Sequence, residues 1–466
     1  MAEDTGYGDK FQLEYYRGMN IYIRKFMLFT SGAAFVIIAP LVILYAIGYR
    51  PQASSGISRS VGVILADATP DHASISVNGT AYGTLPRSIP NIDPGMATIQ
   101  ITKEGYTAWE KQLEVKANQA MDIRSIQLLP SLFETTLVAR NVTQFEPSPN
   151  NLLIAVTTNK NTLFVIDETG ALIMREEKLG ARATAISWSP DGSHILVTFP
   201  KNTYQLFRVN ATSLVKIPSK EFTGFTTIHW SPTTANAIYA LDKNRSLISY
   251  TVSTSSLEIV KKNINLFTVA GRTLYYQTFE NELGALQLRS NGTRILAQDT
   301  GKALKKISVG SDDTVGLLFV NGELTIQNIN GDSTTISPNA EDMSWSPDGK
   351  LLLVQTAPTE LSIYNVANER LFAVPMGELH LITRLSGSIA NPRWFPDSLH
   401  ILFETNNSLV FSEIDTRDHP VSRVIDTAKA TGHLTFGDKS KSIFYMQSNN
   451  KKTNLVQTWL VTQEDR

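Results

Sequence analysis

The hexapeptide SWSPDG stands at Ser187–Gly192 and returns unchanged at Ser344–Gly349. It predicts a strand that ends at the aromatic residue and enters a tight turn, because Pro presets φ, Asp hydrogen-bonds its own backbone and Gly accepts a positive φ. An apolar run follows each copy, at Ile195–Val197 and at Leu351–Val354. Each copy therefore predicts two neighbouring antiparallel strands joined by this turn.

Shorter versions of the phrase recur along the rest of the chain. They lie at Phe145–Pro149, His229–Pro232, Arg393–Asp397 and, more weakly, Thr435–Asp438. The prolines are 43 residues apart from 147 to 190, 42 from 190 to 232 and 49 from 347 to 396, whereas 115 residues separate 232 from 347. The long gap predicts two degenerate copies, near Gly271–Arg272 and near Ser311–Asp313. A period of about 40–50 residues is typical of propeller blades, so residues 131–466 are predicted to form a β-propeller of eight blades, with seven as the alternative.

The ends of the repeat region indicate how the ring closes. The strand expected at Glu134–Ala139 precedes the first turn, so it can complete the last blade beside Leu455–Val461 and remove an open edge. The repeats resemble the TolB-type propeller family, whose hallmark is the WSPDG turn. Two copies match that turn in full, and the resemblance implies a fold more than a function.

Two sets of side chains recur at fixed positions of the repeat. The tryptophans are expected to be core residues packed between blades, with a ligand-stacking cage as the alternative: Trp188, Trp230, Trp345 and Trp394. The residue just before each aromatic is polar and is a candidate to line the central channel: Gln144, Ser187, His229, Ser344, Arg393 and Thr435. Arg393 and His229 are the ones best able to hold an anionic or polar ligand group. The alternative is that these side chains face water or satisfy neighbouring backbone.

Residues 61–130 show a different pattern of short alternating strands. Ala73–Val77 alternates in polarity, and Asn78–Gly79 predicts a hairpin because both positions of that turn need positive φ. Further turn and strand residues follow: Gly83 with Pro86, Pro94 with Gly95, and Lys103 with Gly105 and Tyr106. These residues resemble the PEGA domain family, which implies a small extracytoplasmic β-sandwich of the cell envelope and no catalysis.

The N-terminal region contains 24 consecutive uncharged residues, Phe26–Tyr49. A helix of that length covers the ~30 Å hydrocarbon core of a bilayer, so residues 26–49 are predicted to be a single transmembrane helix in contact with lipid. Four cations precede the segment closely and only two follow it, which predicts a cytoplasmic tail at 1–25 and an extracytoplasmic remainder after a polar linker at 50–60. A cleaved signal peptide and a buried helix are the alternatives.

Composition excludes several kinds of chemistry. The chain has 466 residues, a net charge of -1 and no cysteine, which argues against nucleic-acid binding and rules out disulfides and thiolate sites. The seven histidines have no metal-ligand spacing, and no catalytic motif is present. No cofactor and no metal are therefore expected, and the absence of cysteine favours a bacterial source.

These observations favour a non-enzymatic binding or scaffold protein of the bacterial envelope, anchored in the cytoplasmic membrane. The expected partner is an envelope protein or a cell-wall polymer. Two alternatives remain open from the sequence. One is an ectoenzyme, a glycan or peptide hydrolase or lyase, with its site at the channel mouth. The other is an accessory subunit of a membrane complex.

Overall fold

The computed structural model describes most of the chain. The described residues are 21–46, 61–150, 152–217, 224–234, 236–288, 292–328, 330–366, 374–427, 430–449 and 452–466. Most of the predicted cytoplasmic tail and the predicted linker lie outside these ranges. By their internal contacts the described residues form two compact units, one within 1–101 and 112–126 and the other within 102–111 and 127–466.

A single α-helix, α1, covers Ile21–Ala46 and contains Pro40. It includes most of the predicted membrane segment, whose last three residues are outside the described ranges. Within the described part of the chain, no helix meets the combined requirement of length and hydropathy for crossing a membrane. The structure therefore does not support the transmembrane helix, which stays a prediction from the sequence.

The small domain consists of seven strands in two sheets. One has the order β4-β1-β7 and the other β3-β2-β5-β6. The strands are β1 Gly62–Thr69, β2 Ser74–Val77, β3 Thr80–Thr84, β4 Arg87–Ile92, β5 Gly95–Thr102, β6 Trp109–Val115 and β7 Ala120–Gln127. Alternate residues of β1 are buried, so the strand presents one face to a core that includes Ile64. The predicted hairpin is confirmed, since Asn78 and Gly79 have φ of 49° and 77° between paired Val77 and Thr80.

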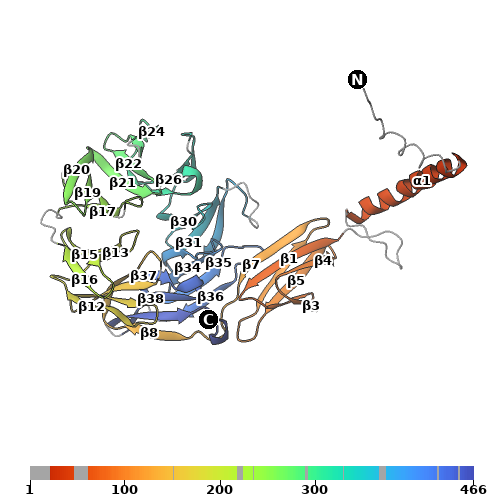
Figure 1. The fold of residues 1–466 in the computed structure, drawn as a ribbon, viewed down its shortest axis with the longest axis horizontal. Helices are drawn as coiled ribbons and strands as arrows, with labels where there is room; N and C mark the ends of the chain where they lie inside the picture. The colour runs from red at the N-terminus through yellow and green to blue at the C-terminus, as the bar shows by residue number, and fades with distance from the viewer. Residues whose placement is uncertain are drawn as a thin grey trace, which may run out of the picture. The chain divides into compact units, whose positions relative to one another are not determined.

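Eight four-stranded antiparallel sheets follow, arranged in a ring (Figure 1). Blade 1 consists of β9 Val142–Pro147, β10 Leu153–Thr158, β11 Thr162–Asp167 and β12 Leu172–Lys178, and blade 2 of β13 Ala185–Trp188, β14 His194–Phe199, β15 Thr203–Val209 and β16 Leu214–Ile217. Blade 3 consists of β17 Thr227–Trp230, β18 Ala237–Leu241, β19 Leu247–Thr251 and β20 Ser256–Lys261, and blade 4 of β21 Ile264–Ala270, β22 Thr273–Thr278, β23 Leu283–Gln287 and β24 Thr293–Ala297. Blade 5 consists of β25 Leu304–Val309, β26 Val315–Phe319, β27 Leu324–Gln327 and β28 Ser333–Ser337, and blade 6 of β29 Asp342–Trp345, β30 Leu351–Ala357, β31 Glu360–Asn365 and β32 Leu379–Arg384. Blade 7 consists of β33 Ile389–Trp394, β34 His400–Thr405, β35 Ser408–Glu413 and β36 Ser422–Asp426, and blade 8 of β37 Ala430–Phe436, β38 Ser442–Asn449, β39 Lys452–Trp459 and β8 Thr135–Ala139.

The repeated phrase forms the turn between the first two strands of a blade. In both full copies the glycine has a φ of 71°, at Gly192 and Gly349. Asp191 Oδ1 accepts a hydrogen bond from the Ser193 amide at 3.1 Å, and Asp348 Oδ1 accepts one from the Lys350 amide at 3.2 Å. The two degenerate copies also lie where the spacing predicted, between β21 and β22 and between β25 and β26.

The ring closes as the sequence predicted. Strand β8 pairs antiparallel with β39, with Leu137 opposite Val456, so the first strand of the propeller completes the last blade. The core is divided into eight buried clusters, each shared by two consecutive blades. One of them joins blade 8 to blade 1 through Phe444 and Phe145. Because every described blade packs on two neighbours, no sheet face is left without a partner.

Candidate functional site

All six candidate channel-facing residues lie on the first strand of a blade. Along the ring, β9 contacts β13 and β37, while β25 contacts β21 and β29. The first strands are therefore neighbours at the inner edge of the sheets. Five of the six candidate side chains are half-buried, and Thr435 is buried.

The structure brings two of these six residues to one pocket. Arg393 and Ser344 line a hollow of about 520 Å³ formed mainly by β25, β29, β33 and β37, here called the four-blade pocket. The other lining residues are Lys306, Asp342, Trp345, Pro347, Gln355, Asn391, Pro392, Trp394, Leu434 and Phe436. Gln144, Ser187, His229 and Thr435 are not among the residues that line it.

Arg393 carries the unbalanced charge of the four-blade pocket. Lys306 Nζ donates to Asp342 Oδ1 at 2.7 Å and to the Met343 carbonyl at 2.8 Å, so these two opposite charges satisfy one another. Arg393 makes no hydrogen bond or ion pair with any residue that the structure describes. Two cations and one carboxylate line the pocket, which leaves a net charge of +1.

A β-bulge positions the Arg393 side chain. The pairing of β33 with β34 shifts register between Ala390 and Arg393, and Asn391 within the bulge has a φ of 49°. Asn391 Nδ2 donates to Glu404 Oε1 at 3.0 Å, which holds the bulged residue against the next strand. An extra residue in one strand re-aims the side chains beside it, so the bulge decides where Arg393 points.

Three of the four repeat tryptophans donate a hydrogen bond to the preceding blade. Trp188 Nε1 donates to the Glu146 carbonyl at 2.9 Å, and Trp394 Nε1 donates to the Ser344 carbonyl at 3.0 Å. Trp230 Nε1 donates to Ser187 Oγ at 3.1 Å. These bonds and the burial of the rings place the tryptophans between blades.

Trp345 breaks this pattern. Its indole nitrogen is buried and has no hydrogen-bond partner among the described residues. The ring lies close to the preceding blade at Gly310, where a Cβ would stand 2.7 Å from it. The turn of that blade joins Val309 to Val315 and is one residue shorter than the turn that joins Trp188 to Ile195.

His229 lies away from the four-blade pocket. Its ring packs edge-on against Phe267, with 5.1 Å between centroids, and burial lowers its pKa. The neutral form is therefore favoured. Of the two residues predicted to be best able to hold an anionic or polar ligand group, Arg393 lines the four-blade pocket and His229 does not.

The acids of the repeated turn serve local structure. Burial raises the pKa of Asp397, but hydrogen bonds from the His400 ring at 2.6 Å and from backbone amides outweigh it, and the pKa lies below its ordinary value. Asp191 behaves alike, with Ser189 and Ser193 as side-chain donors. Within the described ranges, no group of three or more possible metal ligands comes together.

A buried charged cluster, which the sequence did not predict, lies in the unit that contains residues 102–111 and 127–466. The Lys111 side chain is fully buried, pairs with Glu413 and donates to the Asp415 carbonyl at 2.7 Å. Trp109 Nε1 also donates to Glu413 Oε2, at 3.1 Å, and Arg417 binds Asp415 through two nitrogens. Every charge in this cluster has an opposite partner, so it fastens the segment 102–111 to β35.

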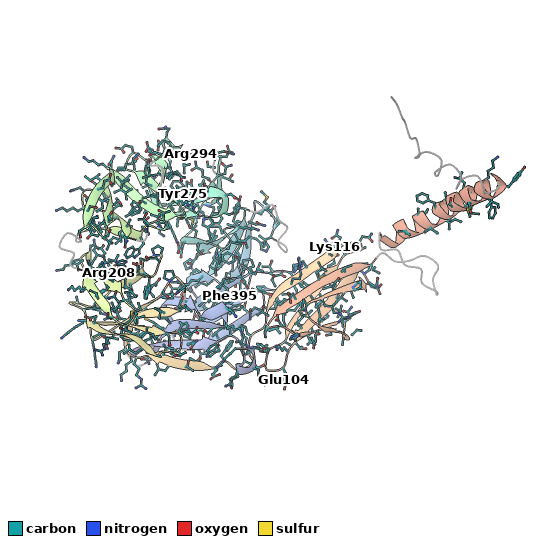
Figure 2. The ribbon with its side chains drawn as sticks, in the orientation of Figure 1. Glu104, Lys116, Arg208, Tyr275, Arg294 and Phe395 are labelled. Atoms are coloured by element: carbon teal, nitrogen blue, oxygen red, sulfur yellow. The ribbon has the colours of Figure 1, made fainter. Side chains whose placement is uncertain are left out.

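A second hollow, of about 370 Å³, lies between the turns of blades 4 and 5. Asp313 in its wall accepts a hydrogen bond at 2.9 Å from the hydroxyl of Tyr275, which is labelled in Figure 2. Burial, and then this hydrogen bond, raises the pKa of Tyr275 well above its ordinary value. Tyr275 therefore stays protonated and acts as a structural donor.

Comparison with known proteins agrees with both domains. Residues 61–128 match the PEGA domain family, and residues 145–233 match the anaphase-promoting complex subunit 4 WD40 domain. No curated protein matches the chain. Among solved structures, the C-terminal WD40 domain of Sif2 shares 11% identity at a TM-score of 0.50, over 69% of this chain and 97% of that one. The dihydro-heme d1 dehydrogenase NirN in complex with DHE shares 12% identity at a TM-score of 0.51, over 67% of this chain and 71% of that one.

At such identities the likeness shows the fold alone. The PEGA assignment and the β-propeller are confirmed, and the propeller is WD40-like. The TolB-type character of the repeats stays a prediction.

Proposed function

We propose that this chain is a non-enzymatic binding protein whose propeller presents a recognition surface at the inner ends of its blades. The four-blade pocket carries the proposal. Its lysine and carboxylate neutralise one another, and its remaining ionisable group is a guanidinium. Arginine stays protonated at physiological pH and offers several fixed donors, so it suits binding better than proton transfer.

We further propose that the protein is held at the cytoplasmic membrane of a bacterium, with its PEGA domain and propeller outside. The support is the uncharged run Phe26–Tyr49 and the excess of cations before it. Most of the described apolar side chains of α1 are exposed, for example Phe29 at 78% and Phe35 at 72%. The envelope setting, the TolB-type character of the repeats and an envelope protein or cell-wall polymer as partner belong to the same proposal.

Site-specific photocrosslinking of the full chain tests the binding surface. One variant carries benzoylphenylalanine at position 341, an exposed position next to Asp342 of the four-blade pocket. A matched variant carries it at position 257 on the outer strand β20, where the native Leu257 is 45% exposed. We expect one defined crosslinked partner from position 341 and not from position 257. Identical products from both positions, or none from either, would overturn the proposal, and so would turnover of envelope glycans or peptides by the purified chain.

Protease accessibility tests the orientation. In spheroplasts, externally added protease should degrade the propeller while leaving a short N-terminal fragment with the membrane. Release of the intact protein by carbonate washing would refute the anchor without touching the proposed binding surface.

A further inference from the structure

We propose that the four-blade pocket binds a small organic anion, with a carboxylate on Arg393 and an apolar body against the wall formed by β29, β33 and β37. This inference rests on the proposed binding function and specifies the ligand class of that site. Recognition of a macromolecular partner would not require it.

Charge selects the sign of the ligand. Lys306 Nζ and Asp342 Oδ1 form an ion pair at 2.7 Å. Arg393 is half-buried and has no hydrogen-bond or ion-pair partner in the described ranges. A guanidinium without a counter-charge in a partly enclosed wall favours an anion, since the lower local dielectric strengthens the attraction. The planar fork of Arg393 matches the two oxygens of a carboxylate.

The apolar side chains of the four-blade pocket favour a ligand with an apolar part. The indoles of Trp345 and Trp394 and the side chains of Leu434 and Phe436 line the same pocket as Arg393. Its volume of about 520 Å³ lies within the ~300–1,000 Å³ common for small-molecule sites. An aromatic or aliphatic carboxylate satisfies both features, because its apolar part contacts the half-buried rings of Trp345 and Phe436 while its charged end reaches the arginine.

The unpaired indole N–H of Trp345 supports the same binding site. A buried N–H without an acceptor is destabilising, and Trp345 is the repeat tryptophan that has one. A carboxylate oxygen that enters beside this indole would supply the acceptor after a small shift of the ring. Ligand binding should therefore change the surroundings of Trp345 as well as those of Trp394.

Calorimetric titration of the full chain tests the ligand class. The probes are 2-naphthoate and its neutral isostere 2-naphthamide. We expect naphthoate to bind about tenfold to a hundredfold more tightly, the range of one charge-assisted hydrogen-bonded contact. Arg393→Gln should abolish this preference. Arg182→Gln, which removes an exposed arginine that does not line the pocket, should leave it unchanged.

Indole ¹⁵N resonances locate the probe. The chain has six tryptophans, and those of Trp345 and Trp394 are assigned from their Phe variants. Naphthoate should shift these two resonances and leave that of Trp188 in place. Equal affinity for the acid and the amide, a preference that survives Arg393→Gln, or shifts at other tryptophans would overturn the inference. If photocrosslinking at position 341 succeeds while the titration fails, the binding function stands and the ligand class is wrong.

Discussion

Replacing each repeat tryptophan with phenylalanine tests how the blades are held together. Trp230 and Trp345 form the matched pair, because both are half-buried and occupy the same position of the repeat. Trp230 donates to Ser187 Oγ at 3.1 Å, while the Trp345 nitrogen has no acceptor among the described residues. The loss of ring volume is the same for both substitutions, so the hydrogen bond makes the difference.

The expected magnitude follows from that bond. Trp230→Phe loses a hydrogen bond with a net value of ~1 kcal/mol. Trp345→Phe instead removes a buried unpaired N–H whose desolvation costs about 1–3 kcal/mol. Trp345→Phe should therefore destabilise the chain by about 2–4 kcal/mol less than Trp230→Phe, or even stabilise it.

Urea unfolding followed by near-ultraviolet circular dichroism measures the two midpoints. Ser187→Ala, alone and combined with Trp230→Phe, closes a double-mutant cycle that should show a coupling of ~1 kcal/mol. Equal destabilisation by the two tryptophan variants, or a coupling near zero, would refute the assignment of these indoles as hydrogen-bonded links between blades.

Three further predictions concern the charged cluster, pH and ring closure. Lys111→Met leaves Glu413 buried without its cation and should destabilise the chain by about 3–5 kcal/mol. Adding Glu413→Gln removes the unpaired charge, so the double variant should recover part of this loss. Urea midpoints that show no recovery would speak against a paired buried charge. Burial lowers the pKa of His229 in the folded chain. As the pH falls below ~6.5, the unfolded chain therefore binds a proton at this histidine that the folded chain does not. The contribution of His229 to the free energy of unfolding should be complete above that pH and decrease below it. His229→Gln should flatten the decline in urea midpoint between pH ~7 and ~5, and an unchanged slope would exclude His229 as a cause. Gln457→Pro removes a backbone donor that faces Thr136 of β8, so the amides of β8 should exchange hydrogen at least about tenfold faster while those of β30 do not. Uniform loss of protection would contradict local closure.

Local chemistry explains why the propeller was predictable from the sequence. The turn at Ser187–Gly192 is specified by its own six residues, and its second copy at Ser344–Gly349 has the same glycine φ and the same aspartate bond. Even the degenerate copy at Ser311–Asp313 retains a turn, since Asp312 and Asp313 both adopt positive φ, which Asp tolerates better than most residues. Spacing then fixed the positions of the blades.

The site was predictable only in part. The position of Arg393 before an aromatic residue marked it as a candidate, but the bulge that aims it and the neutral pairing of Lys306 depend on neighbouring strands. His229 has the same place in its repeat and instead packs on Phe267, a residue of the next blade.

The Lys111 cluster joins residues about 300 positions apart, as the separation of 304 between Lys111 and Asp415 shows. Strand β6 did hold a signal for it. Alternate residues of β6 are buried, and Lys111 shares the inward face with Trp109 and Leu113. A lysine on the inward face of an alternating strand needs a buried partner, but the strand alone does not say which residue that partner is.

Because β8 pairs with a strand near the other end of the chain, the ring can close only late in synthesis. Thr135 and Thr458, whose hydroxyls lie 2.7 Å apart in the last blade, are separated by 323 residues. At a ribosomal rate of about 5–20 residues per second, β8 waits roughly 16 to 65 seconds for its partner strand. Throughout that interval the growing chain carries an unpaired strand, and blade 1 lacks the neighbour that will cover Phe145. The nascent protein is therefore exposed to association with other chains until its final residues are made, and factors that shield it are needed earliest at the blade that is translated first.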